Sequence, residues 1–380
     1  RPGTDVYYME LARTYAYAGK QGYLLAALDG LMREILDDPN RAVSMLANTD
    51  GWNGILRPGE GPEEYMHTRS PFLSYNPVLP PLPPRKARRA AAKYKGAIVY
   101  LCCSSAHEKR DLTYSLTALN RYFTRRYPYP VVVLHENIDE GDMDDLALAF
   151  GESSRLLVFE PAVFGFPDDM PDEERRAIEA IPLPGERGRI GYRHMCRFYC
   201  YGLFRMDVMK DFDYYWRLDS DSFLTAEVGY DVFERMAVNN KVYGYNVVLR
   251  EGGSLIDGLW DTVEKYMRDT GQKFQSMQSQ WNGHPYPCDP GSCMGFYTNF
   301  EISRLDFWRS PEYLRLWSYF ERERGTFVKQ WGDAQLHYLA VSLLLPESKV
   351  QSFADVAYWH QFYAGFPPDA PPERPARARA

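Results

Sequence analysis

Short apolar runs alternate with longer amphipathic stretches after residue 95, and this rhythm constrains the fold most. GAIVYLCC (Gly96–Cys103), VVVLHE (Val131–Glu136) and LLVF (156–159) contain strand-favouring residues with little polar alternation. Such runs are typical of strands that are covered on both faces. Helix-like segments that contain LTALNRYF and DDLALAFG lie between them. Strand, helix and strand in this order predict an α/β fold with a parallel sheet and right-handed crossovers.

A further strand-like run, DYYWRLDSDSFL (213–224), ends in two acids, Asp219 and Asp221. In open α/β sheets, ligands bind beyond the carboxyl ends of the strands. Two carboxylates with one residue between them can share a hard divalent cation, and the cation can neutralise a diphosphate. For an isolated D-x-D, an Asx-type turn that closes a strand is the simpler interpretation. The pattern therefore needs support from the rest of the chain.

Several protein classes are excluded by what the sequence lacks. It contains neither G-x-G-x-x-G nor G-x-x-x-x-G-K-[ST], so a dehydrogenase or a P-loop enzyme is not expected. A nucleotide-binding fold without such a loop must hold phosphates in another way, and a metal ion is one. The net charge of −7 argues against general nucleic-acid binding. No run approaches the roughly 18 apolar residues of a membrane helix.

The chain is expected to fall into three parts. Residues 1–95 form a helical extension or stem with a proline-rich linker, 96–366 form the main α/β domain, and 367–380 form a disordered tail. Because the first residue is Arg1, we expect a piece of a longer protein from which a targeting segment is missing.

The six cysteines indicate neither a disulfide scaffold nor paired zinc ligands. Cys288 and Cys293 flank a turn in PCDPGSC and could close a small loop by a disulfide. Cys196 and Cys200 lie four apart on an expected helix, which favours packing over bonding. This cysteine usage permits a secretory compartment without requiring one.

Six strings carry a resemblance to a known family: YRHMCRF (192–198), YYWRLDSD (214–221), VYGYNVVLREGGSLIDGLWDTVEKYM (242–267), NFEISRLDFWRSPEY (299–313), WGDAQLHYLA (331–340) and ADVAYWHQ (354–361). In this order they resemble the fungal-type α-1,2-mannosyltransferases of glycosyltransferase family 15, Golgi enzymes that extend yeast mannoproteins. The resemblance implies a GT-A fold, a GDP-mannose donor, Mn²⁺, and transfer with retention of anomeric configuration. It also implies a type II Golgi membrane protein that faces the lumen.

The resemblance assigns a metal site and a donor-face carboxylate. Asp219 stands where the family has Glu in W-R-V-E-P, which leaves open whether Asp219 or Asp221 binds the metal directly. His360 in YWHQ matches the histidine that completes the metal site. Glu301 matches a nucleophile or donor-face carboxylate of a retaining transfer. The alternative from the residues alone is a capping box, Thr298-x-x-Glu301, in which Glu301 ties down the start of a helix.

Acceptor-side roles fall on a helix that contains Asp333 and His337, four residues apart and therefore on one face. That face is expected to meet the acceptor sugar, with Asp333 as a base or a hydroxyl anchor. Simple helix capping by Asp333 is the competing interpretation.

Donor-side roles fall on Tyr192, which matches a family tyrosine, and on three arginines. Arg193, Arg197 and Arg217 are candidates for pairing with phosphate or carboxylate groups. Arg217 lies within the strand-like run that ends in Asp219 and Asp221, where it could instead hold Asp219 in place.

The expected function is transfer of mannose from GDP-mannose to the 2-hydroxyl of a terminal α-mannoside on a glycoprotein glycan. The expected partners are this donor and a mannose-terminated acceptor, with no nucleic acid, and with a membrane only through a missing N-terminal anchor. A GT-A transferase that uses another sugar nucleotide, and a carbohydrate-binding relative without turnover, are the alternatives.

Overall fold

The computed structural model describes residues 94–224, 227–276, 288–289, 291–360 and 363–365. The expectations for the stem, the linker and the C-terminal tail lie outside these residues. Among the described residues, no helix is long and apolar enough to cross a membrane.

The chain divides into two compact units, residues 89–356 and residues 1–88 with 357–380. What is described of the second unit is an antiparallel hairpin of β12 (Tyr358–His360) and β13 (Tyr363–Gly365). All other described elements belong to the first unit.

A seven-stranded sheet with the order β11-β6-β10-β4-β1-β2-β3 forms the centre of the first unit, as its described residues show. The pairs β1–β2, β2–β3, β1–β4 and β6–β11 are parallel, and β10 runs antiparallel to both of its neighbours. The strands of this sheet are β1 (Gly96–Cys103), β2 (Val131–Glu136), β3 (Leu157–Pro161), β4 (Tyr214–Leu218), β6 (Tyr243–Tyr245), β10 (Phe300–Arg304) and β11 (Val350–Ser352).

A smaller sheet has the order β7-β9-β8. Its strands, together with the short β5 that follows β4, are β5 (Ser222–Leu224), β7 (Val248–Gly252), β8 (Cys288–Asp289) and β9 (Ser292–Phe296). The described helices are α5 (Ala106–Leu119), α6 (Glu140–Phe150), α7 (Asp172–Glu179), α8 (Ile190–Arg197), α9 (Val232–Val238), α10 (Leu259–Thr270), α11 (Leu305–Trp308), α12 (Pro311–Arg322), α13 (Gly325–Val328) and α14 (Asp333–Leu344).

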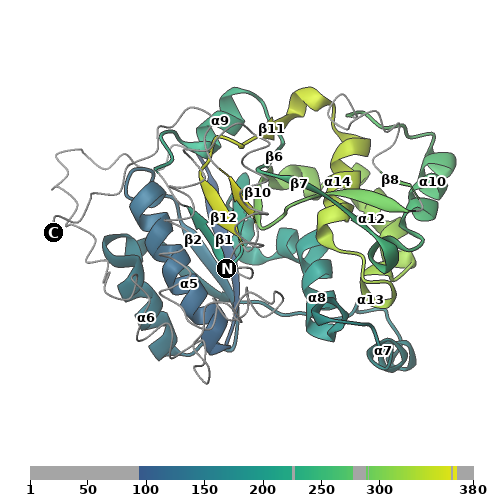
Figure 1. Cartoon of the computed structure of the whole chain (residues 1–380), viewed down its shortest axis with the longest axis horizontal. Helices are drawn as coiled ribbons and strands as arrows, with labels where there is room; N and C mark the ends of the chain where they lie inside the picture. The colour runs from purple at the N-terminus through teal and green to yellow at the C-terminus, as the bar shows by residue number, and fades with distance from the viewer. Residues whose placement is uncertain (1–93, 225–226, 277–287, 290, 361–362, 366–380) are drawn as a thin grey trace, which may run out of the picture. The chain divides into compact units, whose positions relative to one another are not determined.

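Helices cover both faces of the main sheet. Helix α5 lies beside α6 (Figure 1) and packs on the face of Tyr100, whose hydroxyl lies 2.9 Å from Ser115 Oγ. Helix α14 covers the other face, where its Asp333 meets Arg217 of β4. It is apolar nearly all round, and its residues from Leu336 to Leu343 are buried, as expected of a helix enclosed in a core.

The strands β1 and β2 have the predicted bounds, and their pairing is parallel as predicted. The bounds and the parallel pairing were predictable because both strands are continuous buried apolar runs, which are typical of strands between two layers of helices. The predicted disulfide between Cys288 and Cys293 is present, with 4.1 Å between the Cα atoms. Cys196 and Cys200 are buried free thiols, which confirms the packing interpretation.

The apolar content of IGYRHMCRFYCYGLFRM (190–206) predicts one long helix, and the helix in the structure is shorter. Helix α8 ends at Arg197, and a wider π-type turn from Phe198 to Gly202 follows it. The turn buries Tyr199 under the sheet, where its ring centroid lies 3.3 Å from Arg217 Cζ. A π-type turn inside a helix often accompanies a functional site.

The close packing that leads into α14 gives a stability prediction. A Cβ atom on Gly325 would lie 1.9 Å from the indole ring of Trp331, two residues before α14. We expect Gly325→Ala to lower the free energy of unfolding in urea by about 1–3 kcal/mol, since the ring must move. Gly229→Ala is the control, because its added Cβ meets nothing within 4 Å. Equal stability of the two variants would contradict the packing described.

Candidate active site

The two acids Asp219 and Asp221 follow β4 at its carboxyl end, in a tight turn. The N–H of Ser222 donates to the carbonyl of Asp219 at 3.0 Å, and the Ser222 hydroxyl donates to the carbonyl of Asn299. The turn is closed by backbone and serine contacts, whereas an Asx-type turn would be closed by an acid side chain. It leaves both acidic side chains partly exposed, and 30% of the Asp219 side chain is accessible. The turn and a metal-binding role are thus compatible.

The buried side chain of Arg217 holds Asp219 in place. It is 2% exposed on β4, and its Nε lies 3.0 Å from Asp219 Oδ1 while its Nη1 lies 2.6 Å from Asp333 Oδ2. Burial lowers the pKa of Arg217, but Asp219, Tyr199 and Asp333 raise it more strongly, so the guanidinium stays charged. Arg217 therefore holds Asp219 in place, as one sequence interpretation expected. Its predicted contact with a donor phosphate stays a prediction.

Asp333 is the first residue of α14 and is 5% exposed. Its Oδ2 also accepts a hydrogen bond of 2.8 Å from the Thr298 hydroxyl. Burial raises the pKa of Asp333, but Arg217, His337 and Thr298 together lower it below its ordinary value. A carboxylate with a lowered pKa is a weak general base, so these contacts favour an anchoring role over proton abstraction.

Glu301 lies in β10 and is 1% exposed. It contacts His337, which lies one turn after Asp333 on α14. Glu301 Oε2 lies 2.6 Å from both His337 Nδ1 and the Tyr243 hydroxyl, and the Tyr215 hydroxyl donates to Oε1. Burial raises the pKa of Glu301, whereas His337 and the two phenols lower it more, so the net shift is downward. The side chain is a buried, ionised carboxylate with hydrogen bonds on both oxygens.

Two expectations are corrected here. Glu301 lies in a strand, so the capping box with Thr298 is wrong; Thr298 bonds to Asp333 instead. His337 is fully buried against Glu301, so it does not share a surface with the acceptor sugar. The physical reason is the same in both cases, because α14 is enclosed and its polar side chains bond to the sheet beneath it.

The donor-side candidates other than Arg217 lie on α8. Tyr192 is partly buried, and burial is the main cause of its raised pKa. Arg193 is 3% exposed and donates to the carbonyls of Phe327 and Ile178, which does not favour phosphate binding. Arg197 pairs with Glu321 at 2.9 Å, a carboxylate contact of the kind expected.

His360 is the last residue of β12, in the second unit, and pairs in register with Tyr363. Its predicted place in a metal site stays a prediction.

Three residues that the sequence interpretation did not name join the site region. Glu251 of β7 forms an ion pair of 2.7 Å with Arg187 and accepts a 2.6 Å hydrogen bond from Gln335 of α14. The sequence signal for Glu251 and Gln335 is their place in two of the family strings: Glu251 lies within 242–267, and Gln335 lies two residues after Asp333 within WGDAQLHYLA.

The fold and the acid-tipped central strand define the protein class as a GT-A glycosyltransferase. The sequence pattern of the glycolipid 2-alpha-mannosyltransferase family matches residues 68–371, so the chain belongs to this family. This confirms the resemblance seen in the sequence.

Two curated relatives come from Candida albicans. Glycolipid 2-alpha-mannosyltransferase 1 is 36% identical over 283 residues, which cover 73% of this chain and 65% of the relative. Glycolipid 2-alpha-mannosyltransferase 2 is 30% identical over 292 residues, which cover 72% of this chain and 60% of the relative. The chain thus spans less than two thirds of the length of either relative.

Two solved structures confirm the predicted fold. Core-mannan synthase A from Aspergillus fumigatus, in a Mn/GDP form, has a TM-score of 0.65 at 23% identity and covers 77% of this chain and 83% of its own. The mannosyltransferase Ktr4p from Saccharomyces cerevisiae, in complex with GDP, has a TM-score of 0.63 at 25% identity, with coverage of 74% and 78%.

The buried pair of Arg217 and Asp333 generates a pH-dependent prediction. Arg217→Met leaves Asp333 buried without its cation, and we expect a loss of about 3–5 kcal/mol of unfolding free energy at pH 7. In the parent, the lowered pKa of Asp333 gives stability that is present above about pH 4 and is lost as the pH falls through the folded-state value. In the variant, burial without the cation raises that pKa, so protonation relieves the penalty.

The difference in unfolding free energy between the parent and Arg217→Met should therefore be smaller at pH 4 than at pH 7. Chemical denaturation at both pH values measures it. Lys265→Met is the control, because Lys265 pairs with Asp269 on the surface, and such a pair contributes at most about 1 kcal/mol. A difference that does not depend on pH would contradict the described ion pair.

Proposed function

We propose that this chain carries the catalytic region of a metal-dependent, retaining α-1,2-mannosyltransferase. It transfers mannose from GDP-mannose to the 2-hydroxyl of a terminal α-mannoside on a glycoprotein glycan. The observation that carries the proposal is the pair Asp219 and Asp221 at the end of β4, with Asp219 held by a buried arginine. Family membership and the GDP complexes of the two similar structures support it.

The residues present fit a divalent metal ion. Asp219 and Asp221 can each offer one carboxylate oxygen, a hard donor that suits a divalent ion. The family resemblance adds His360 as a proposed nitrogen ligand, and such a mixed donor set would suit Mn²⁺. When bound, the ion supplies charge neutralisation for the donor diphosphate and for the departing GDP. The similar structure from A. fumigatus is a Mn/GDP form, in line with this assignment.

Glu301 acts in this proposal as a fixed negative charge. A retaining transfer needs a group that bonds to an oxocarbenium-like centre or stabilises it. Glu301 is 1% exposed and both of its oxygens accept hydrogen bonds, which favours stabilisation by charge over a covalent bond. Asp333 anchors Arg217 and, through it, the metal-binding acid.

The proposed donor-binding residues are Tyr192 and Asp219, and Arg217 acts through Asp219, which it holds in place. Arg193 and Arg197 contribute to the same region by fixing α8, since their guanidinium groups bond to neighbouring backbone and to Glu321.

The proposed location is the Golgi lumen, with the full-length protein anchored as a type II membrane protein. The Cys288–Cys293 disulfide supports an oxidising compartment, because disulfides persist there and are rare in the cytosol.

The donor is tested by incubating the protein with Mn²⁺ and a panel of sugar nucleotides, with and without α-methyl mannoside as acceptor. We expect GDP-mannose to be turned over and α-1,2-linked dimannoside to form, because the chain belongs to this family. EDTA should abolish the reaction. Turnover of UDP-sugars alone would favour a transferase with another donor, and no turnover of any donor would favour a carbohydrate-binding relative.

The acids are tested by Asp219→Asn and Asp221→Asn. Each removes the charge of one hard ligand, so we expect most transfer activity to be lost, together with the Mn²⁺-dependent thermal stabilisation by GDP. Without ligand, the melting temperature of Asp221→Asn should change little, since a partly exposed polar side chain contributes little to packing. Asp219→Asn also removes one charged partner of the buried Arg217, so its melting temperature should fall. The matched control is Asp207→Asn, an acid whose side chain is 86% exposed. The metal assignment is wrong if both site variants bind GDP and Mn²⁺ like the parent.

A further inference from the structure

The diphosphate of a sugar nucleotide needs positive charge beyond that of one metal ion, and the arginines expected to supply it are engaged elsewhere. Arg193 donates to two backbone carbonyls, and Arg197 pairs with Glu321. Arg217 lies beneath the sheet surface with only 3% of its side chain accessible. Each of these three guanidinium groups is thus held by protein groups.

Arg187 differs from them in exposure and in position. Its side chain is 42% accessible, and its Nη1 lies 2.7 Å from Glu251 Oε1. The phenol of Tyr297 lies within electrostatic reach of both Arg187 and the strand-end acids. Burial is the largest cause of the raised pKa of Tyr297, Asp221 and Asp219 raise it further, and Arg187 opposes them. Hydrogen bonds and ion pairs connect Arg187 to Asp219 as well: Glu251, the partner of Arg187, bonds to Gln335 of α14, and Asp333 of the same helix pairs with Arg217, which holds Asp219.

The loop that carries Arg187 is braced. The N–H of Gly188 donates to the carbonyl of Gly185, whose φ of +69° suits glycine. A Cβ atom on Gly188 would lie 2.1 Å from the carbonyl oxygen of Leu183, so the chain passes very close to itself here. The buried Gln330 also donates to the carbonyl of Pro184 at 2.9 Å. The arginine thus projects from a fixed turn.

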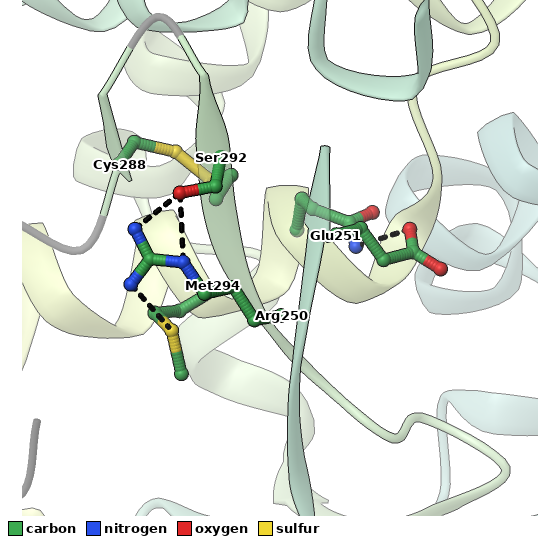
Figure 2. Close-up of a disulfide and its surroundings, with 7 residues drawn as sticks. Arg250, Glu251, Cys288, Ser292 and Met294 are labelled. Atoms are coloured by element: carbon green, nitrogen blue, oxygen red, sulfur yellow. Dashed lines mark hydrogen bonds between the residues drawn. A yellow bond between two sulfur atoms is a disulfide. The ribbon is translucent and has the colours of Figure 1, made fainter. Parts of the chain in front are cut away.

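The carboxylate partner of Arg187 is braced as well. Glu251 Oε2 accepts from Gln335 Nε2 at 2.6 Å, and Gln335 lies two residues after Asp333 on α14. Figure 2 shows that Glu251 and its neighbour Arg250 point to opposite sides of β7, with Arg250 toward the disulfide and Glu251 away from it. The Arg187–Glu251 pair is therefore tied to the helix that also orients Arg217 and Asp219.

We propose that Arg187 is a donor-binding residue whose guanidinium contacts the diphosphate of the sugar nucleotide and stabilises it as it departs. The inference rests on the proposed function and names a phosphate contact for the same site. A guanidinium has five N–H donors in a planar fork, so it can hold the Glu251 carboxylate at one side and a phosphate at another. Charge-assisted hydrogen bonds of this kind are stronger than neutral ones.

The test measures GDP and GMP binding by calorimetry in the presence of Mn²⁺ for the parent, Arg187→Gln and Arg187→Lys. We expect Arg187→Gln to weaken GDP binding by about tenfold, the usual size of a lost charged hydrogen bond. GMP binding should change much less, because GMP lacks the second phosphate. Arg187→Lys should lie between the parent and the Gln variant, since lysine keeps the charge but not the fork.

Arg126→Gln is the matched control. The Arg126 side chain is 45% exposed and pairs with Glu227 at 3.1 Å, so the variant loses a comparable surface ion pair elsewhere and should bind GDP like the parent. Unchanged GDP binding by Arg187→Gln would overturn the inference. Equal weakening of GDP and GMP would also overturn it, since that result indicates only a structural role. A parent protein that binds no guanine nucleotide would overturn the proposed function together with this inference.

Discussion

The buried guanidinium of Arg217 is the interaction on which the site depends. A charge that is 2% exposed in the central strand is costly unless it is paired, and here it is paired on two sides, with Asp333 and with Asp219. The first pair attaches α14 to the sheet. The second fixes an acid at the strand end, where ligands bind in α/β folds. One side chain therefore connects the packing of the core to the place where chemistry is expected.

The same face of the sheet carries a second buried polar group. Glu301 pairs in register with Arg217 across β4 and β10, and strand periodicity turns both side chains toward α14. There Glu301 meets His337, one helical turn after Asp333. Helix α14 thus places its Asp333 carboxylate against Arg217 of the sheet. It places its His337 imidazole against Glu301 of the sheet. Such complementary pairs oppose rotation or sliding of the helix, and they keep the strand-end acids in a defined position.

Features of the sequence that depend on local pattern were predictable, and features that depend on distant partners were not. β1 and β2 have the predicted bounds because each is a buried apolar run. The disulfide follows from two cysteines beside one turn. Glu301 matched a helix-capping motif, yet it lies in a strand. Its partners Tyr215 and His337 are 86 and 36 residues away in the sequence. No local pattern encodes such partners. The family strings predict Asp219 and Asp221 as the metal-binding acids, but no string shows that Arg193 donates to the carbonyls of Phe327 and Ile178.

The central claim is that the acids after β4 hold a divalent ion together with a guanine nucleotide. The most direct test is crystallography of the protein with Mn²⁺ and GDP, using anomalous scattering at the manganese absorption edge. The account predicts one strong anomalous peak bonded to a carboxylate oxygen of Asp219 or Asp221 and to an oxygen of the GDP diphosphate. A nucleotide bound with no manganese peak at these acids, or manganese bound elsewhere on the chain, would contradict it.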